Sequence, residues 1–227
     1  MRALFFGSIG VLVETSELQR QAYNRAFAEH GLDWHWNIAT YCQLLATPGG
    51  QRRLTSLSGG RLSEIEISRI HATKQRVFGE LLASGVAARP GITDSIDLAR
   101  RHGLKIGFVT TTTPRTLRTV QDALAGQVDF STFDVITSKA DVASEKPDSE
   151  VYGFALETLG IDTGDAIAFE DTAVNQGAAT NAGLRCHLFA GEYAVTAGAP
   201  LQTRNPAQDL ASLLADRSAH GQSVAAE

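Results

Sequence analysis

Cysteine is scarce in this sequence, and the two cysteines present lie far apart. Cys42 and Cys186 fit neither a disulfide framework nor the close spacing of a metal knuckle. We therefore expect two buried free thiols, as in a protein kept in a reducing cytosol. This scarcity argues against the small domains that depend on disulfides or on a structural metal.

Long apolar runs and blocks of positive charge are also missing. No stretch reaches the ~18 apolar residues that a membrane span needs. Arg2 and the apolar run after it imitate a short signal peptide, but no small-residue cleavage site follows. The net charge is −5 without any Lys/Arg block, which argues against nucleic acid or an anionic membrane as a partner. We therefore expect a soluble, cytoplasmic protein.

What the chain does contain is enough apolar sequence for a sizeable core. Its 227 residues are 43% hydrophobic and 20% charged, which suits one large domain or a domain with an insert. The run Ala3–Phe6 reads as a buried strand, followed by a glycine-bearing turn at Gly7–Gly10. Ligands of open α/β sheets bind beyond the carboxyl ends of such strands. The residues that follow Phe6 are therefore expected to form the bottom of the active site.

Residues 16–85 read as an all-helical insert after the first strand. Apolar spacing and end signals predict helices over 16–30, 38–45, 52–57 and 63–82. A Pro48–Gly49–Gly50 break separates the second helix from the third. Since about seventy residues far exceed an ordinary loop, we predict a helical cap domain. Residues 86–91 then form the hinge that returns the chain to the sheet.

From Ile92 onward, helices and strands alternate, which predicts a doubly wound parallel α/β sheet. The expected helices are 92–102, 114–125, 149–159, 172–182 and 206–214, and the expected strands are 105–110, 133–137, 165–170 and 184–189. We predict a core domain of residues 1–15 and 86–215, and a flexible tail over 216–227.

Polar residues follow several of these strands. Thr110 and Thr111 end the second strand, Lys146 lies in SEKPDSEVY, and Glu170–Asp171 end the strand before TAVNQGAA. A lysine offers a point charge to phosphate oxygens, and adjacent carboxylates suit a hard cation. Taken alone, a threonine-rich turn is usually a helix cap, a Lys-Pro pair usually lies on the surface, and an acidic pair at a strand end is more often a solvated turn or an N-cap. Their joint order is the informative feature.

Together these motifs resemble the haloacid dehalogenase (HAD) phosphatases. The stretch RALFFGSIGVLVET is similar to their motif F-D-x-D-G-[VT]-L-x-[DE]-T, matched by Phe6, Gly10, Leu12, Glu14 and Thr15. The later segments resemble K-P-x-P-D-x-Y and F-E-D-S-x-x-G-x-x-A-A. The resemblance spans residues 2 to about 200 and is strongest to the CbbY-type sugar-bisphosphate phosphatases and the β-phosphoglucomutase-like group. It implies a HAD-like, Rossmannoid core with an inserted helical cap.

The resemblance fails at the two reactive positions. Gly7 stands where the family has its aspartate nucleophile, and Ile9 where it has its general acid/base. The family reaction forms an aspartyl-phosphate that the second aspartate helps to hydrolyse. Glycine has no nucleophile, and isoleucine can neither donate nor accept a proton. No catalytic residue is therefore intact, and Ser16, Gln19 and Gln51 also depart from the pattern on the cap side.

The remaining site residues are implied by the resemblance. The phosphate-binding candidates are Thr110, Thr111 and Lys146, and the cap contacts are Gly49, Gly50, Arg53, His71 and Lys74. For Mg²⁺, the family pattern leaves Asp171, the carbonyl of Ile9 and, behind them, Glu170. Because one carboxylate ligand is missing, we expect Mg²⁺ binding to be weak or absent unless a phosphate completes the shell.

Three functions remain open at this point. The leading hypothesis is an inactive HAD homologue that binds a phosphorylated small molecule or a protein partner. A second is a weak or altered sugar-phosphate hydrolase, with metal-activated water held by Glu170 and Asp171. A third is an interaction subunit that pairs with an active paralogue. The fold by itself does not decide between them.

Overall fold

The computed structural model describes residues 1–45, 49–193 and 205–224, with side chains up to residue 215. At its centre is a five-stranded sheet with the order β3-β2-β1-β4-β5. The strands are β1 (Ala3–Phe6), β2 (Lys105–Phe108), β3 (Val135–Ile136), β4 (Ala166–Glu170) and β5 (Arg185–Leu188). All neighbouring strands are parallel, which confirms the predicted sheet.

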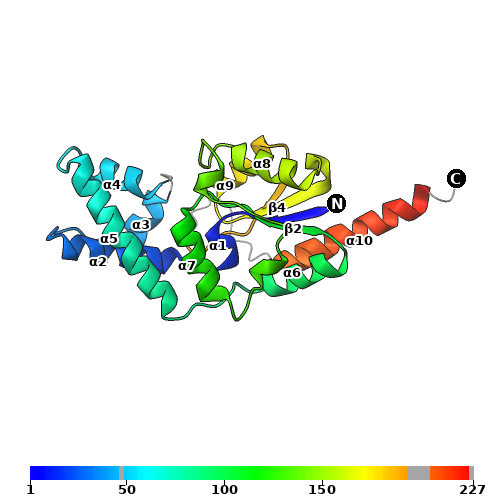
Figure 1. Cartoon of the computed structure of the whole chain (residues 1–227), viewed down its shortest axis with the longest axis horizontal. Coiled ribbons are helices and arrows are strands. Elements are labelled where there is room, and N and C mark those ends of the chain that lie inside the picture. The colour runs from blue at the N-terminus through cyan, green and yellow to red at the C-terminus, as the bar shows by residue number, and fades with distance from the viewer. Residues whose placement is uncertain (46–48, 194–204, 225–227) are drawn as a thin grey trace.

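Strand β1 is completely buried because both of its faces are covered. Leu4 and Phe6 pack in one core cluster with side chains of α6 (Ile92–Arg101), α7 (Pro114–Leu124) and α10 (Pro206–Val224). Ala3 and Phe5 pack in the opposite cluster with α8 (Glu150–Leu159) and α9 (Ala173–Asn181). Figure 1 shows these helices on the two sides of the sheet. The sheet is therefore doubly wound, as alternation of helix and strand predicts.

Four helices form a lobe at one end of the core (Figure 1). They are α2 (Ser16–Glu29), α3 (Ile38–Leu44), α4 (Gly50–Ser58) and α5 (Glu64–Ala83). A capping box between Ser63 and Glu66 fixes the start of α5. The lobe has its own aromatic core, in which the rings of Tyr23 and Trp36 lie 4.5 Å apart. We call this lobe the cap.

Several element boundaries differ from the prediction. The turn after β1 contains one helical turn, α1 (Ile9–Leu12), and helix α4 begins at Gly50 instead of Arg52. The strand expected over 133–137 shortens to β3, because a 3-10 turn, η1 (Phe130–Thr132), precedes it. Two further 3-10 turns are η2 (Lys139–Asp141) and η3 (Thr163–Asp165). Pro48, part of the predicted break, lies outside the described residues.

The last helix is longer than predicted. Helix α10 continues to Val224, so the predicted end at Leu214 is wrong, while the flexibility of residues 216–227 stays a prediction. The prediction ended the helix where the apolar spacing of the sequence ends, but backbone helix does not require an apolar stripe.

Two further expectations from the sequence concern the cysteine thiols and membrane-spanning helices. Cys42 and Cys186 are free, as expected, but each is only partly buried. Across the part of the chain that the structure describes, none of the helices has the length and apolarity needed to cross a bilayer.

Candidate functional site

A cavity of about 320 Å³ lies between the carboxyl ends of the central strands and the cap. The predicted residues that line it are Gly49, Gly50, Arg53, His71, Lys74, Thr110, Thr111, Lys146 and Asp171. Glu170, Gly7 and Ile9 do not line it. The structure thus brings the phosphate-binding candidates of the core and the contact candidates of the cap to one cavity. We call its two sides the core wall and the cap wall.

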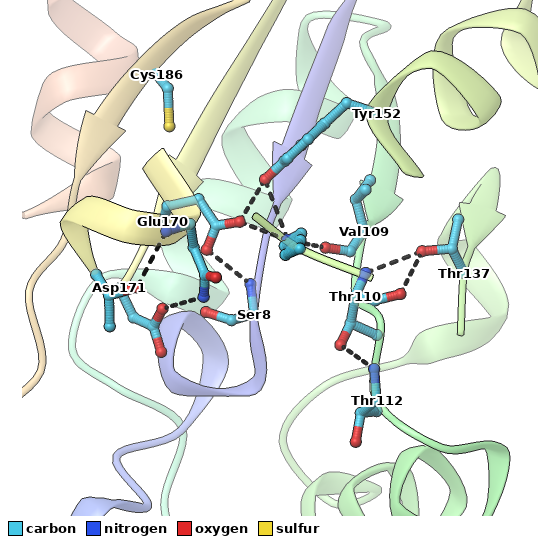
Figure 2. Close-up of polar contacts among 12 residues, drawn as sticks. Ser8, Val109, Thr110, Thr112, Thr137, Tyr152, Glu170, Asp171 and Cys186 are labelled. Carbon is cyan, nitrogen blue, oxygen red and sulfur yellow. Dashed lines mark hydrogen bonds and ion pairs between the residues drawn. The ribbon is translucent and has the colours of Figure 1, made fainter. Parts of the chain in front are cut away.

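Behind the core wall, the carboxylate of Glu170 is completely buried. Its Oε1 accepts hydrogen bonds from Lys146 Nζ and, at 2.5 Å, from the Tyr152 hydroxyl. Its Oε2 accepts a bond of 3.1 Å from the backbone N–H of Ser8. Figure 2 shows Tyr152 and Ser8 reaching the carboxylate from different segments. Glu170 therefore has a complete set of donors inside the protein.

The position of this carboxylate depends on Gly7. A Cβ atom at position 7 would lie 2.2 Å from Cδ of Glu170 and 2.4 Å from its Oε1. No real side chain tolerates such distances, so any other residue at position 7 would force Glu170 to move. The carboxylate of Glu170 thus occupies the space just above Gly7, where the family's nucleophile would begin.

Lys146 is held in the same buried group. Its Nζ donates to the carbonyl oxygen of Val109 at 2.7 Å, to Glu170 and, at 3.3 Å, to the Tyr152 hydroxyl. A lysine ammonium has three donors, and all three have partners here. Burial and the charge of Glu170 raise the pKa of Tyr152 well above its ordinary value, so the phenol stays protonated and donates. Lys146 reaches the core wall, but its charge is already compensated.

Asp171 lines the cavity and packs closely against Gly10 of helix α1. A Cβ at Gly10 would lie 2.1 Å from its Oδ2, and Asn175 Nδ2 donates to its Oδ1 at 3.1 Å. Burial, followed by the nearby charge of Glu170, raises the pKa of Asp171. The carboxyl group of Asp171 is thus poorly solvated, and hydrogen bonding with Ser8 and Asn175 partly offsets this rise in its pKa.

These residues, as placed, do not fit a Mg²⁺ site. The Glu170 carboxylate is paired with Lys146, and the Ile9 carbonyl accepts a 3.0 Å bond from the Val13 N–H. Within the described ranges, no three His, Cys, Asp or Glu side chains are grouped to hold a metal ion. Mg²⁺ needs near-octahedral oxygen ligands, with carboxylates or phosphates among them. Weak or absent Mg²⁺ binding stays a prediction.

The threonines after β2 complete the core wall. The Thr110 N–H donates to Thr137 Oγ1 at 2.9 Å, and the Thr137 hydroxyl donates to the Thr110 carbonyl at 2.8 Å. The Thr110 hydroxyl oxygen accepts a bond of 3.1 Å from the Thr112 N–H, as Figure 2 shows. This geometry fixes the turn and leaves the Thr110 hydroxyl proton available to a ligand.

The cap wall carries a buried lysine, Lys74. The Lys74 side chain is buried; its Nζ donates to Gln19 Oε1 and, at 3.3 Å, to Gln75 Oε1. Burial, and then the charge of Arg53, lowers the pKa of Lys74 to about 7. Among the described residues, no carboxylate forms an ion pair with Lys74. A cavity with such a wall suits an anionic ligand.

His71 and Gly50 lie beside this charge. Burial, followed by the charges of Lys74 and Arg53, lowers the pKa of His71 to about 4, so the imidazole is neutral at physiological pH. A Cβ at Gly50 would lie 2.6 Å from His71 Nε2 and 2.7 Å from the Tyr23 hydroxyl. Glycine at position 50 therefore allows helix α4 to approach the other cap helices closely.

Sequence reasoning missed two residues that shape the site. Tyr152 is not among the predicted site residues, although it ends the stretch SEKPDSEVY, six residues after Lys146, which was a usable signal. Arg89, in the hinge, donates to the carbonyls of Gly10 at 2.7 Å, Phe189 at 2.8 Å and Ala190 at 2.7 Å. A single arginine in the otherwise small and apolar segment VAARPG was the available signal for this clamp.

Comparison with known proteins identifies the class. The model of the haloacid dehalogenase-like hydrolases matches residues 1–183, so the chain belongs to this family. It is 37% identical over 197 residues to Protein CbbY of Rhodobacter capsulatus, covering 85% of this chain and 87% of that protein. It is 38% identical over 194 residues to the plasmid-encoded CbbY of Cupriavidus necator, covering 81% and 76%. Within the family, the chain is a CbbY-like phosphatase homologue.

Solved structures agree with this placement. CbbY from Rhodobacter sphaeroides in complex with phosphate has a TM-score of 0.77 and 36% identity, covering 88% of this chain and 92% of that one. A mutant of the same enzyme in complex with xylulose-(1,5)bisphosphate has a TM-score of 0.79 and 34% identity, covering 92% and 96%. The HAD-like core expected from the sequence is thereby confirmed.

Proposed function

We propose that this protein is a catalytically inactive CbbY-like member of the HAD family that binds a phosphorylated small molecule between cap and core. The main support is the cavity of about 320 Å³. Its cap wall holds the buried Lys74, which has no carboxylate partner among the described residues. HAD phosphatases generally use Mg²⁺, but the residues described at this site, as placed, do not fit a Mg²⁺ ion.

Three features support the absence of turnover. Position 7 has no nucleophile, and Ile9 cannot transfer a proton. Loss of a general acid/base alone typically lowers a rate by ~10²–10⁴-fold. The nearest carboxylate behind the core wall, that of Glu170, is buried and bonded at both oxygens. This arrangement also argues against a metal-activated water held jointly by Glu170 and Asp171.

The cap wall and the threonines supply the expected ligand contacts. Arg53 and Lys74 carry the charge for a phosphate group, and Thr110 and Thr111 offer hydroxyls from the core wall. Lys146 contributes less charge than the family pattern implies, because Glu170 is already its counter-ion. Since relatives were solved with phosphate and with xylulose bisphosphate, a sugar phosphate or bisphosphate is the ligand class proposed for this cavity.

Binding and turnover are tested on the same protein. Xylulose 1,5-bisphosphate and a panel of sugar monophosphates are titrated by calorimetry and by thermal shift, since a specific ligand stabilises the folded state by mass action. We expect binding that Lys74→Met weakens at least ~10-fold, which corresponds to ~1.4 kcal/mol. Arg69→Met is the matched control, because Arg69 is exposed on the same helix and does not line the cavity.

The outcomes separate the alternatives. No binding by any phosphorylated compound overturns the ligand proposal and favours a protein-partner role. Phosphate release with Mg²⁺ that Asp171→Asn abolishes overturns the inactivity and indicates an altered hydrolase.

A further inference from the structure

Three donors converge on one buried point behind the core wall. They are the Ser8 N–H after β1, the Lys146 ammonium before α8 and the Tyr152 hydroxyl within α8. Each comes from a different segment, and the only anion among them is the chain's own Glu170 carboxylate. Figure 2 shows the Ser8 and Tyr152 bonds meeting at the two carboxylate oxygens. Without this carboxylate, the one cation and two neutral donors would form a binding site for another anion.

The glycine at position 7 provides the room for this arrangement. Glu170 belongs to the neighbouring strand β4, and its carboxylate lies over Gly7, within 2.5 Å of where a Cβ would be. Gly7 is absent from the glycines with positive φ, so its backbone conformation is open to any residue. What restricts position 7 is therefore the carboxylate above it.

We infer that the Ser8 N–H, Lys146 and Tyr152 form a latent anion site that Glu170 plugs. The plug fills the space of one small carboxylate, so free carboxylate anions do not enter this point behind the core wall. A ligand's anionic group then meets the cap wall and the threonine hydroxyls. Removing the plug exposes a site for one small anion. This inference goes beyond the proposed function, because it holds whether or not the cap wall binds a sugar phosphate.

A nucleophilic role for Glu170 fits the contacts less well. Its Oε1 accepts two hydrogen bonds and its Oε2 accepts a third, and the residue does not line the cavity. A nucleophile needs an oxygen that reaches the reacting atom. The bonding pattern is that of an internal counter-ion.

Anion rescue tests the plug directly. Glu170→Ala removes the carboxylate and leaves a gap of about the size of acetate. Thermal unfolding is followed in sodium acetate, in sodium phosphate and in sodium chloride of equal ionic strength. We expect acetate to raise the melting temperature of Glu170→Ala by at least ~2 °C over chloride, because an anion that binds the folded state stabilises it by mass action. The wild type should show no such gain.

Glu145→Ala is the matched control, because Glu145 is a carboxylate that lines the same cavity but forms an exposed ion pair with Lys139. An acetate gain in this control, or none in folded Glu170→Ala, overturns the inference. A gain with phosphate but not with acetate would also overturn it, because the vacated space matches a carboxylate.

A second test does not require Glu170→Ala to fold. Gly7→Ala adds a methyl group at the plugged position without changing any charge, and should lower the melting temperature well below that of wild type. Gly153→Ala in α8 is its control, since nothing lies within 4 Å of the added atom, and should leave the temperature unchanged or raise it. Where Glu170→Ala folds, it should reduce the effect of Gly7→Ala. A harmless Gly7→Ala in the wild type would show that the carboxylate does not occupy this space.

Discussion

The two walls of the cavity each carry a buried lysine, and the two lysines are in opposite electrostatic situations. On the core wall, Lys146 has an ion-pair partner, Glu170, and all three of its donors are used. On the cap wall, Lys74 donates to amide oxygens, and its Nζ lies 5.0 Å from the Tyr23 ring centroid and 4.9 Å from that of Phe78. Lys146 has its counter-ion within the protein, whereas Lys74 has no carboxylate partner among the described residues.

This difference matters because burying an unpaired charge is costly. Glu170 removes that cost for Lys146, although position 7 carries no carboxylate. Lys74 has no such counter-ion among the described residues, which is the arrangement expected where a ligand supplies the anion.

The largest expected effect comes from breaking the core pair. Lys146→Met leaves Glu170 buried without its cation and should lower the free energy of unfolding by ~3–5 kcal/mol, because an unpaired buried charge keeps its desolvation penalty. Lys146→Met combined with Glu170→Gln should recover most of the loss. Urea unfolding of the single and double variants measures both. A single variant within ~1 kcal/mol of wild type would contradict the buried pair.

The cap lysine should respond to pH instead. Its pKa is about 7 when folded and 10.5 in the unfolded reference, so the unfolded chain binds more protons between these values. Stability should therefore rise with pH from about 7 to 10.5, by up to ~1.4 kcal/mol per pH unit from this group. Lys74→Met should lack this component, which chemical unfolding at several pH values measures. Parallel pH curves for the two proteins would disprove it.

Rebuilding the first motif should change metal binding more than activity. Gly7→Asp with Ile9→Asp should restore Mg²⁺ binding, because the new aspartate at position 7 takes over Lys146 and frees Glu170 beside Asp171. Phosphatase activity should stay weak, since Ser16, Gln19 and Gln51 depart from the family on the cap side and a misplaced substrate reacts slowly.

Calorimetry with Mg²⁺ and a sugar-phosphate assay on the folded double variant decide this prediction. Turnover in the ordinary range of ~1–10³ s⁻¹ would show that the cap has not diverged. Unchanged Mg²⁺ affinity would contradict the alignment of Gly7 with the nucleophile.

The smallest effect should come from the exposed pair at the cavity rim. Glu145→Gln breaks its contact with Lys139, but both side chains are about half exposed. Pairs of this kind contribute about 0–1 kcal/mol, so stability and ligand affinity should hardly change. A large loss of either would mean that the rim, and not the two buried lysines, governs the site.

Sequence patterns were sufficient for the sheet and for part of the cavity lining, but not for Glu170, which lies behind the wall, or for Tyr23 and Tyr41, which line the cavity. The apolar run of β1 and the alternation after Ile92 reflect burial on two faces, which is a local property of each strand. The pairing of Glu170 was out of reach, because it depends on the space above Gly7 and on donors from three separate segments. The length of α10 was missed since its last residues carry no apolar stripe.

The carboxylate above Gly7 also couples position 7 to position 170 in evolution. Once Glu170 fills that space, every single substitution at position 7, including a return to aspartate, first meets an atom 2.2 Å from the new Cβ. An aspartate at position 7 and the present placement of the Glu170 carboxylate therefore exclude each other, so a return of aspartate there requires the Glu170 side chain to move.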